Sequence, residues 1–225
     1  MTNTYGRLIA AVVVGLLVGP AWADCGFCAS GSQQTEENKH SECPHHKAHA
    51  GHTASNSSPD FTLNDLDGDT YKLSDLKGKV VVLEWVNHEC PFTNRFVKNG
   101  TVKKIISKFS GNPFVWLGID SSHFAESKKG AIRKWAGDNK VDYPILLDAS
   151  GEVGRAFKAK TTPHIFVIDQ QGKVAYNGAF DDDAYDTKSK KHNYVEEAVT
   201  ALLNDSTVAT ATTKSYGCSV KYKSK

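Results

Sequence analysis

An uninterrupted apolar run, Val80–Leu83, leads directly to the pair Cys90-Pro91, after which apolar residues recur at helical spacing. A run without polar alternation predicts a strand buried on both faces of a sheet. Beyond Pro91, apolar side chains every three or four residues predict a helix, broken at Asn99-Gly100. The chain therefore contains a strand–cysteine–helix unit, whose helical inner face comprises Phe92, Phe96, Val97, Val102, Ile105, Ile106 and Phe109.

The sequence on either side extends this unit into an α/β domain. A hairpin is expected around the turn pair Asp67-Gly68. Strands that alternate with helices predict parallel pairing, and a last hairpin is expected at the turn Gln171-Gly172. Further strands are predicted at Phe114–Ile119, Tyr143–Leu147, Ile165–Ile168 and Val174–Tyr176, and helices at Glu126–Trp135, Glu152–Phe157 and Tyr194–Leu203.

Composition separates this domain, residues 59–205, from its flanks. Residues 24–58 are poor in large apolar side chains and rich in Ser, Gln, Lys, His and Cys, so they are expected to form a flexible leader. The tail, residues 206–225, has too few apolar residues to fold alone. The length between the flanks suits one domain of about 150 residues with its own core.

The N-terminus predicts export. Arg7 precedes the apolar run Leu8–Val18 and small residues that end at Ala23, which is the order of a cleavable signal peptide over residues 1–23. The run is shorter than the roughly 20 residues that cross a bilayer, so no stable membrane insertion is expected after cleavage. We expect a periplasmic or extracellular protein.

The sequence contains five cysteines. Because this number is odd, at least one thiol has no intramolecular disulfide partner.

Cys90 has the sequence context of a nucleophile. A strand that passes through Cys-Pro into a helix places the sulfur at the helix N-terminus, where unpaired amides and the macrodipole favour the thiolate. Pro91 suits the first helical position, because its missing N–H has no partner there in any case. His88 could lower the thiol pKa further. The alternative is that Cys90 is a buried structural thiol.

Three segments resemble the thioredoxin superfamily and, within it, the exported redoxin or peroxiredoxin-like (AhpC/TSA-related) family. In Glu84–Thr93, Cys90 falls at the first cysteine of the thioredoxin Cys-x-x-Cys and Thr93 replaces the second. Thr161–His164, with Thr162 before Pro163, resembles the cis-proline loop that packs on the active-site sulfur and offers backbone groups to a substrate. The third segment is the N-terminal hairpin extension, Phe61–Lys79. The resemblance implies a thioredoxin-like fold, with a central mixed sheet flanked by helices and a cis peptide bond before Pro163.

The same resemblance suggests further roles. Glu84 occupies the place of the buried acid of thioredoxins; the alternative is a strand residue at the edge of the sheet. Asn87 stands where peroxiredoxins have a Thr, so peroxidase activity does not carry over directly. The segment Tyr216–Tyr222 resembles the ending of peroxiredoxin-like proteins, which suggests that Cys218 folds back to pair with Cys90. The alternatives are an incidental surface thiol at Cys218, a solvated loop residue at His88 and an ordinary turn proline at Pro163.

These residues predict a thiol–disulfide oxidoreductase or a peroxiredoxin-like antioxidant. Cys90 would attack a protein disulfide or a peroxide, Cys218 or a leader cysteine would resolve the intermediate, and an external thiol would reduce the chain. No cofactor is required. The net charge is +2 with acidic and basic residues interleaved, so nucleic acid is not an expected partner.

A rival function rests on the leader, whose ligand types suit zinc or copper. In that reading the protein is a metal carrier or redox sensor. The alternatives are a disordered linker with an oxidised Cys25–Cys28 pair, or an arm that carries electrons to Cys90. The acidic run Asp181–Asp183 is expected to be a solvated loop rather than a cation site. The candidate metal ligands are Cys25, Cys28, Cys43, His45, His46 and His49.

Overall fold

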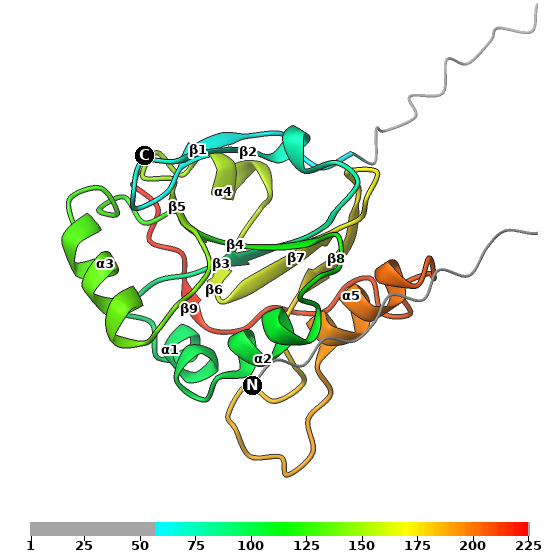
Figure 1. Ribbon diagram of the computed structural model, residues 1–225. Coiled ribbons are helices and arrows are strands. Elements are labelled where there is room, and N and C mark those ends of the chain that lie inside the picture. Colours follow the sequence, from blue (N-terminus) through cyan, green and yellow to red (C-terminus); the bar gives the residue numbers. More distant parts are fainter. Residues whose placement is uncertain (1–56, 225) are drawn as a thin grey trace, which may run out of the picture. The chain divides into compact units, whose positions relative to one another are not determined.

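The computed structural model describes residues 57–224, which lie within one compact unit of the chain. A five-stranded sheet runs through it in the order β5-β4-β3-β7-β8 (Figure 1). The central strand pairs in parallel with β4 and antiparallel with β7, so the expected mixed sheet is confirmed. The strands are β3 (Val80–Trp85), β4 (Phe114–Asp120), β5 (Ile145–Leu147), β7 (His164–Ile168) and β8 (Val174–Gly178).

Every residue of β3 is buried, because helices and loops cover both faces of the sheet. Val80 and Val82 face one core, which α1, α2 and α5 complete. Val81 and Leu83 face the opposite core, which includes side chains from the N-terminal hairpin and Phe157 beside α4. The uninterrupted apolar run is thus explained by a strand that faces an apolar core on each side of the sheet. The helices are α1 (Pro91–Lys98), α2 (Thr101–Lys108), α3 (Lys129–Asp138), α4 (Glu152–Ala156) and α5 (Tyr194–Leu203).

The helices follow the sequence pattern with shifts at their ends. Gly100 separates α1 from α2 and has a φ of +71°, a left-handed conformation that suits glycine. The third helix begins at Lys129 rather than at Glu126, since residues before it form turns. Asn193 caps α5 through its side chain, which accepts the amide N–H of Glu196 over 2.9 Å.

The expected N-terminal hairpin is present as β1 (Thr62–Asn64) and β2 (Thr70–Lys72), followed by the short 3₁₀ helix η1 (Leu73–Leu76). One carboxylate organises its turn. Oδ1 of Asp65 accepts the amide N–H groups of Asp67, Gly68 and Asp69 over 2.8 to 3.0 Å. The turn is therefore built around a buried aspartate as well as the Asp-Gly pair.

The C-terminal tail packs on the domain. Its strand β9 (Cys218–Ser219) pairs antiparallel with β6 (Thr161–Thr162), which no sequence pattern above predicts. Val208 and Val220 are buried, so the tail adds to both cores that flank the sheet. Figure 1 shows the end of the tail in red, with β9 beside β6.

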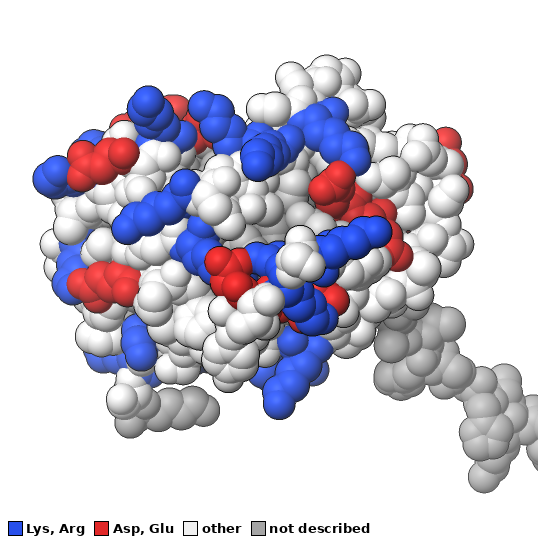
Figure 2. Space-filling model, turned by 90° about the horizontal axis from the view of Figure 1, so that it is seen from below, with Lys and Arg blue, Asp and Glu red and all other residues white. Residues whose placement is uncertain are grey.

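The predicted signal peptide, residues 1–23, and nearly all of the predicted leader lie outside the described residues. Within residues 57–224, no helix has the length and apolar character that a membrane span requires. Over the face shown in Figure 2, basic and acidic side chains lie beside one another, as the interleaved sequence leads one to expect.

Candidate active site

Cys90 lies at the position that precedes the first turn of α1, whose first residue is Pro91. The loop before it is held by Asn87, whose main-chain oxygen accepts the amide of Cys90 over 3.0 Å. The Asn87 side chain accepts the amide of Glu89 and donates to the hydroxyl of Ser122, both over 2.8 Å. The residue at the peroxiredoxin Thr position therefore shapes the loop and anchors it to the end of β4.

Cys90 is 2% exposed, and its thiol donates to the carbonyl oxygen of Thr162 over 2.9 Å. Burial alone would raise its pKa. Hydrogen bonds from the Thr162 side chain, the Thr93 amide and Cys218 outweigh burial and hold the pKa of the Cys90 thiol below its usual value. The site thus favours the thiolate more than burial alone would.

Cys218 reaches this thiol from the tail. It lies opposite Thr162 in the β6–β9 ladder, and its half-buried side chain is hydrogen-bonded to Cys90. Burial, the hydrogen bond with Cys90 and the charge of Cys90 raise the pKa of Cys218 to about 11. Both cysteines are free thiols in this structure, held next to one another.

The loop from Thr161 to His164 has the expected form, with a cis peptide bond between Thr162 and Pro163. Its place follows from the sheet, because His164 at the start of β7 pairs with Trp85 at the end of β3. Nδ1 of His164 accepts the amide of Lys160 over 3.1 Å. Burial and the charge of Lys160 lower the pKa of His164 to about 4, so this imidazole is neutral at pH 7.

Glu84 lies in the central strand, so its interpretation as an edge residue is wrong. It is fully buried and accepts hydrogen bonds from the indole of Trp116 over 3.1 Å and from the hydroxyl of Tyr143 over 3.4 Å. Burial dominates over these two bonds and raises the pKa of Glu84 to about 7. The second carboxylate oxygen, Oε1, has no hydrogen-bond partner among the described residues.

His88 and Thr93 flank the cysteine. Only 10% of the His88 side chain is exposed, so the solvated-loop interpretation is wrong; its Nε2 lies 3.7 Å from Glu89. Thr93 is fully buried, and its amide donates to Cys90. The Thr93 hydroxyl has no partner within residues 57–224. The residue that replaces the second cysteine therefore contributes through its main chain.

Sequence reasoning missed a cluster that holds the tail. Tyr216 donates its hydroxyl to Asp181 and accepts a hydrogen bond from Arg95 over 3.0 Å. Asp181 and Asp183 are buried, which corrects the expectation of a solvated acidic loop. The signal that could have revealed β9 is alternation, since Tyr216, Cys218, Val220 and Tyr222 stand two residues apart.

The candidate metal ligands of the leader, Cys25, Cys28, Cys43, His45, His46 and His49, lie outside the described residues. In the part of the chain that is described, no group of three or more His, Cys, Asp or Glu side chains could hold a metal ion.

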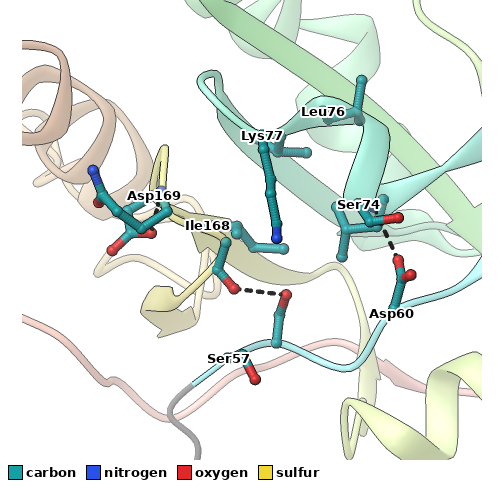
Figure 3. A pocket seen from close by; sticks show the side chains of 12 residues that line it. Ser57, Asp60, Ser74, Leu76, Lys77, Ile168 and Asp169 are labelled. Carbon is teal, nitrogen blue, oxygen red and sulfur yellow. Dashed lines mark hydrogen bonds between the residues drawn. The ribbon is translucent and has the colours of Figure 1, made fainter.

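A small cavity of about 230 Å³ lies at the other end of the sheet (Figure 3). It is lined by Val81, at the start of β3, and by Ile168, its strand partner at the end of β7. The side chain of Lys77 extends along it, while Asp60 accepts the amide of Ser74 at its rim. Cys90 follows the opposite end of β3, so the cavity is separate from the thiol site.

Curated relatives and solved structures resemble this chain at low identity. Thiol-disulfide oxidoreductase ResA of Bacillus subtilis is 31% identical over 117 residues, which cover 52% of this chain and 62% of the relative. ResA of Geobacillus kaustophilus is 28% identical over 116 residues, covering 52% and 63%. The chain thus spans less than two thirds of these relatives.

Two solved structures share the fold. An uncharacterised conserved protein from Geobacillus kaustophilus matches with a TM-score of 0.68, covering 75% of this chain and 92% of its own. A hypothetical protein from Sinorhizobium meliloti matches with a TM-score of 0.66, covering 75% and 94%. Both are 24% identical in sequence, so they establish the thioredoxin-like fold alone.

The family to which the chain belongs is shown by a match to a family model. The model of the AhpC/TSA family covers residues 54–177, more than half of the chain, including Cys90 and the Pro163 loop. Cys218 and the tail lie beyond this match. On the match and the fold together, the chain belongs to the AhpC/TSA family.

Proposed function

We propose that this protein is a thiol–disulfide oxidoreductase in which Cys90 is the nucleophile and Cys218 resolves the intermediate. The observation that carries the proposal is the hydrogen-bonded pair of free thiols, one of them at the N-terminus of α1 beside the Pro163 loop. The lowered pKa of Cys90 and the raised pKa of Cys218 support different roles for the two sulfurs.

The proposed reaction transfers two electrons from the chain to a disulfide. The Cys90 thiolate attacks one sulfur of the substrate, the substrate S–S bond breaks, and the other sulfur leaves as a thiolate. Cys218 then loses its proton and attacks the sulfur of Cys90, which releases the second substrate thiol and forms a Cys90–Cys218 disulfide. An external dithiol restores both thiols and is itself oxidised.

Disulfide exchange is favoured over peroxide reduction by two observations. The curated relatives cited above are named as thiol-disulfide oxidoreductases. In addition, Asn87 replaces the peroxiredoxin Thr and uses its side chain to brace the loop rather than to face a substrate oxygen. With a peroxide, Cys90 would instead pass through a sulfenic acid before Cys218 condensed with it and released water.

We further propose that the protein acts outside the cytoplasm, because the apolar run of residues 8–18 has the form of an export signal. A metal-binding leader is the rival function. Deleting residues 24–58 distinguishes the two: it would abolish zinc or copper binding on the rival view and leave the chemistry of Cys90 unchanged on ours.

The first test follows the pH dependence of alkylation at Cys90 in protein whose other four cysteines are serine. We expect an apparent pKa below the model-thiol value of about 8.5. A second test incubates the reduced protein with a peptide closed by one disulfide. Mass spectrometry should detect a Cys90–Cys218 disulfide, and Cys218→Ser should trap a mixed disulfide at Cys90. A normal pKa together with no trapped adduct would refute the proposal.

A further inference from the structure

The tail occupies the edge of β6 in extended conformation, directly over the reactive sulfur. Cys218 and Ser219 pair with Thr162 and Thr161, and the amide of Val220 donates to the carbonyl oxygen of Lys160 over 3.1 Å. One residue further, the carbonyl oxygen of Lys221 accepts the amide of His123 over 2.8 Å. A strand edge offers one row of backbone groups, so two segments cannot use it together.

Aromatic side chains fix the tail on both sides of this ladder. Tyr222 donates its hydroxyl to the carbonyl oxygen of Ala159 over 2.9 Å, and the Arg155 guanidinium lies 4.7 Å from its ring centre. On the other side, Tyr216 contacts Arg95 and Asp181, and its ring centre lies 6.1 Å from that of Phe92. The segment 216–222 is therefore anchored at its two ends and carries Cys218 between them.

Gly217 permits the close approach of the tail to the Pro163 loop. Its φ is +129°, and a Cβ atom there would lie 2.2 Å from the carbonyl oxygen of Thr162 and 3.3 Å from the nitrogen of Pro163. Both neighbours are main-chain atoms that cannot swing away. The residue before the cysteine at this edge must therefore lack a side chain.

We propose that strand β9 is a displaceable occupant of a docking edge on β6, and that this edge accepts an extended segment of a second protein, with glycine before its cysteine, once β9 has left. This inference rests on the proposed function and adds a partner class to it. The tail acts as an internal competitor: it keeps Cys90 within reach of Cys218 and of small oxidants, and it competes with polypeptide disulfides for the same backbone groups.

Competition explains why the anchors lie outside the ladder itself. The two-residue ladder is short, so the hold on the tail also depends on the side chains beside it, Tyr216, Tyr222 and the buried Val220. Loss of one anchor frees one end of β9, which pairs with β6 and with no strand of the five-stranded sheet. The fraction of molecules with an open edge then sets the apparent rate for polypeptide substrates.

The test compares two probes of different extent. The protein has Cys25, Cys28, Cys43 and Cys218 replaced by serine, so that Cys90 is its one thiol. The small probe is the mixed disulfide of free cysteine with thionitrobenzoate; the long probe is the same disulfide on a peptide with the sequence of residues 214–222. In each reaction the Cys90 thiolate attacks the cysteine sulfur and thionitrobenzoate leaves as a coloured thiolate.

Gly217→Ala should release the tail and raise the ratio of long-probe to small-probe rate constants by about tenfold or more. Gly111→Ala is the matched control, because Gly111 also has positive φ, +85°, but nothing lies within 4 Å of its added Cβ. Tyr222→Ala should raise the ratio through a separate contact. On the tail-released protein, a long probe with valine in place of its glycine should react more slowly than the glycine peptide.

The outcomes separate this inference from the proposed function. If Cys90 reacts with neither probe in any variant, the proposed function fails. If the small probe reacts but neither Gly217→Ala nor Tyr222→Ala raises the ratio above that of Gly111→Ala, the displaceable strand is refuted. Equal rates for the glycine and valine peptides would refute the requirement for glycine alone.

Discussion

Cys218 lies directly opposite Thr162 in the β6–β9 ladder, and Thr162 is the residue whose carbonyl oxygen accepts the thiol of Cys90. Thr162 therefore contacts both cysteines, the sulfur of Cys90 and the main chain of Cys218. The register of the ladder brings the second thiol to the first although the two cysteines are far apart in sequence. A shift of this register by one residue would turn Cys218 to the other side of the ribbon.

Replacing Cys218 tests the electrostatic part of this arrangement. Cys218→Ala removes a hydrogen-bond donor to Cys90, so the pKa of the Cys90 thiol should rise. Cys218→Ser keeps a donor and should leave that pKa closer to the value in the parent. The measurement is the pH dependence of alkylation, with Cys25, Cys28 and Cys43 replaced by serine throughout. A pKa that is the same in the alanine and serine variants would contradict the role of this hydrogen bond.

Glu84 predicts a pH-dependent stability. Its pKa is about 7 in the folded chain against 4.5 for the ordinary carboxyl, so the folded state binds more protons between these values. Its contribution to the free energy of unfolding should therefore fall as pH rises from about 4.5 to 7, by about 3 kcal/mol at most. Glu84→Gln should remove this dependence, because the amide stays neutral and its oxygen can still accept from Trp116.

Urea unfolding at pH 5 and pH 8 measures the effect. Glu126→Gln is the control, since Glu126 is exposed and its replacement should leave the pH dependence unchanged. If Glu84→Gln loses stability between the two pH values as steeply as the parent, the carboxyl is not the titrating group.

Much of the domain could be predicted because its signals are local. The apolar run of β3, the Cys-Pro helix start and the positive-φ break at Gly100 each act within a few residues. The cis bond before Pro163 required resemblance to a family rather than local physics. These features were enough to place Cys90 at the end of the sheet next to the Pro163 loop.

The tail could not be predicted from composition, because its order depends on surfaces supplied by other elements. Tyr216 finds its partners in Arg95 and Asp181, and Tyr222 in Ala159 and Arg155. A segment with few apolar residues can be ordered when the domain supplies most of the contact. For Glu84 the sequence left two alternatives open, a buried acid and an edge-strand residue, and the strand order together with its burial decides for the first.

A buried polar chain beneath the active-site loop yields a further prediction. The hydroxyl of Ser121 accepts the indole N–H of Trp85 over 3.0 Å and donates to Asp148 over 2.6 Å. Ser121→Ala would leave both groups buried without this partner, which should cost about 1–3 kcal/mol. Thermal or urea unfolding measures the loss. Ser107→Ala, on the exposed face of α2, should change stability by about 0.5 kcal/mol or less. Equal effects of the two substitutions would show that the hydrogen bonds of Ser121 contribute nothing to the stability of the fold.

Two substitutions of Tyr222 should weaken the binding of the tail to the domain by different amounts. Tyr222→Phe removes the hydroxyl that donates to Ala159 but keeps the ring against Arg155, so it should weaken the tail by about 0.5–1.5 kcal/mol. Tyr222→Ala also removes the ring, which packs against the apolar cluster around Trp85, and should weaken the tail more. Limited trypsin digestion after Lys214 and Lys221 should therefore be slowest in the parent, faster in the phenylalanine variant and fastest in the alanine variant. Circular dichroism should show the same central sheet in all three, because the five strands of that sheet pair with one another and not with β9. Digestion at one common rate would mean that Tyr222 is not an anchor, and that the tail is held by its β9 ladder and by Tyr216.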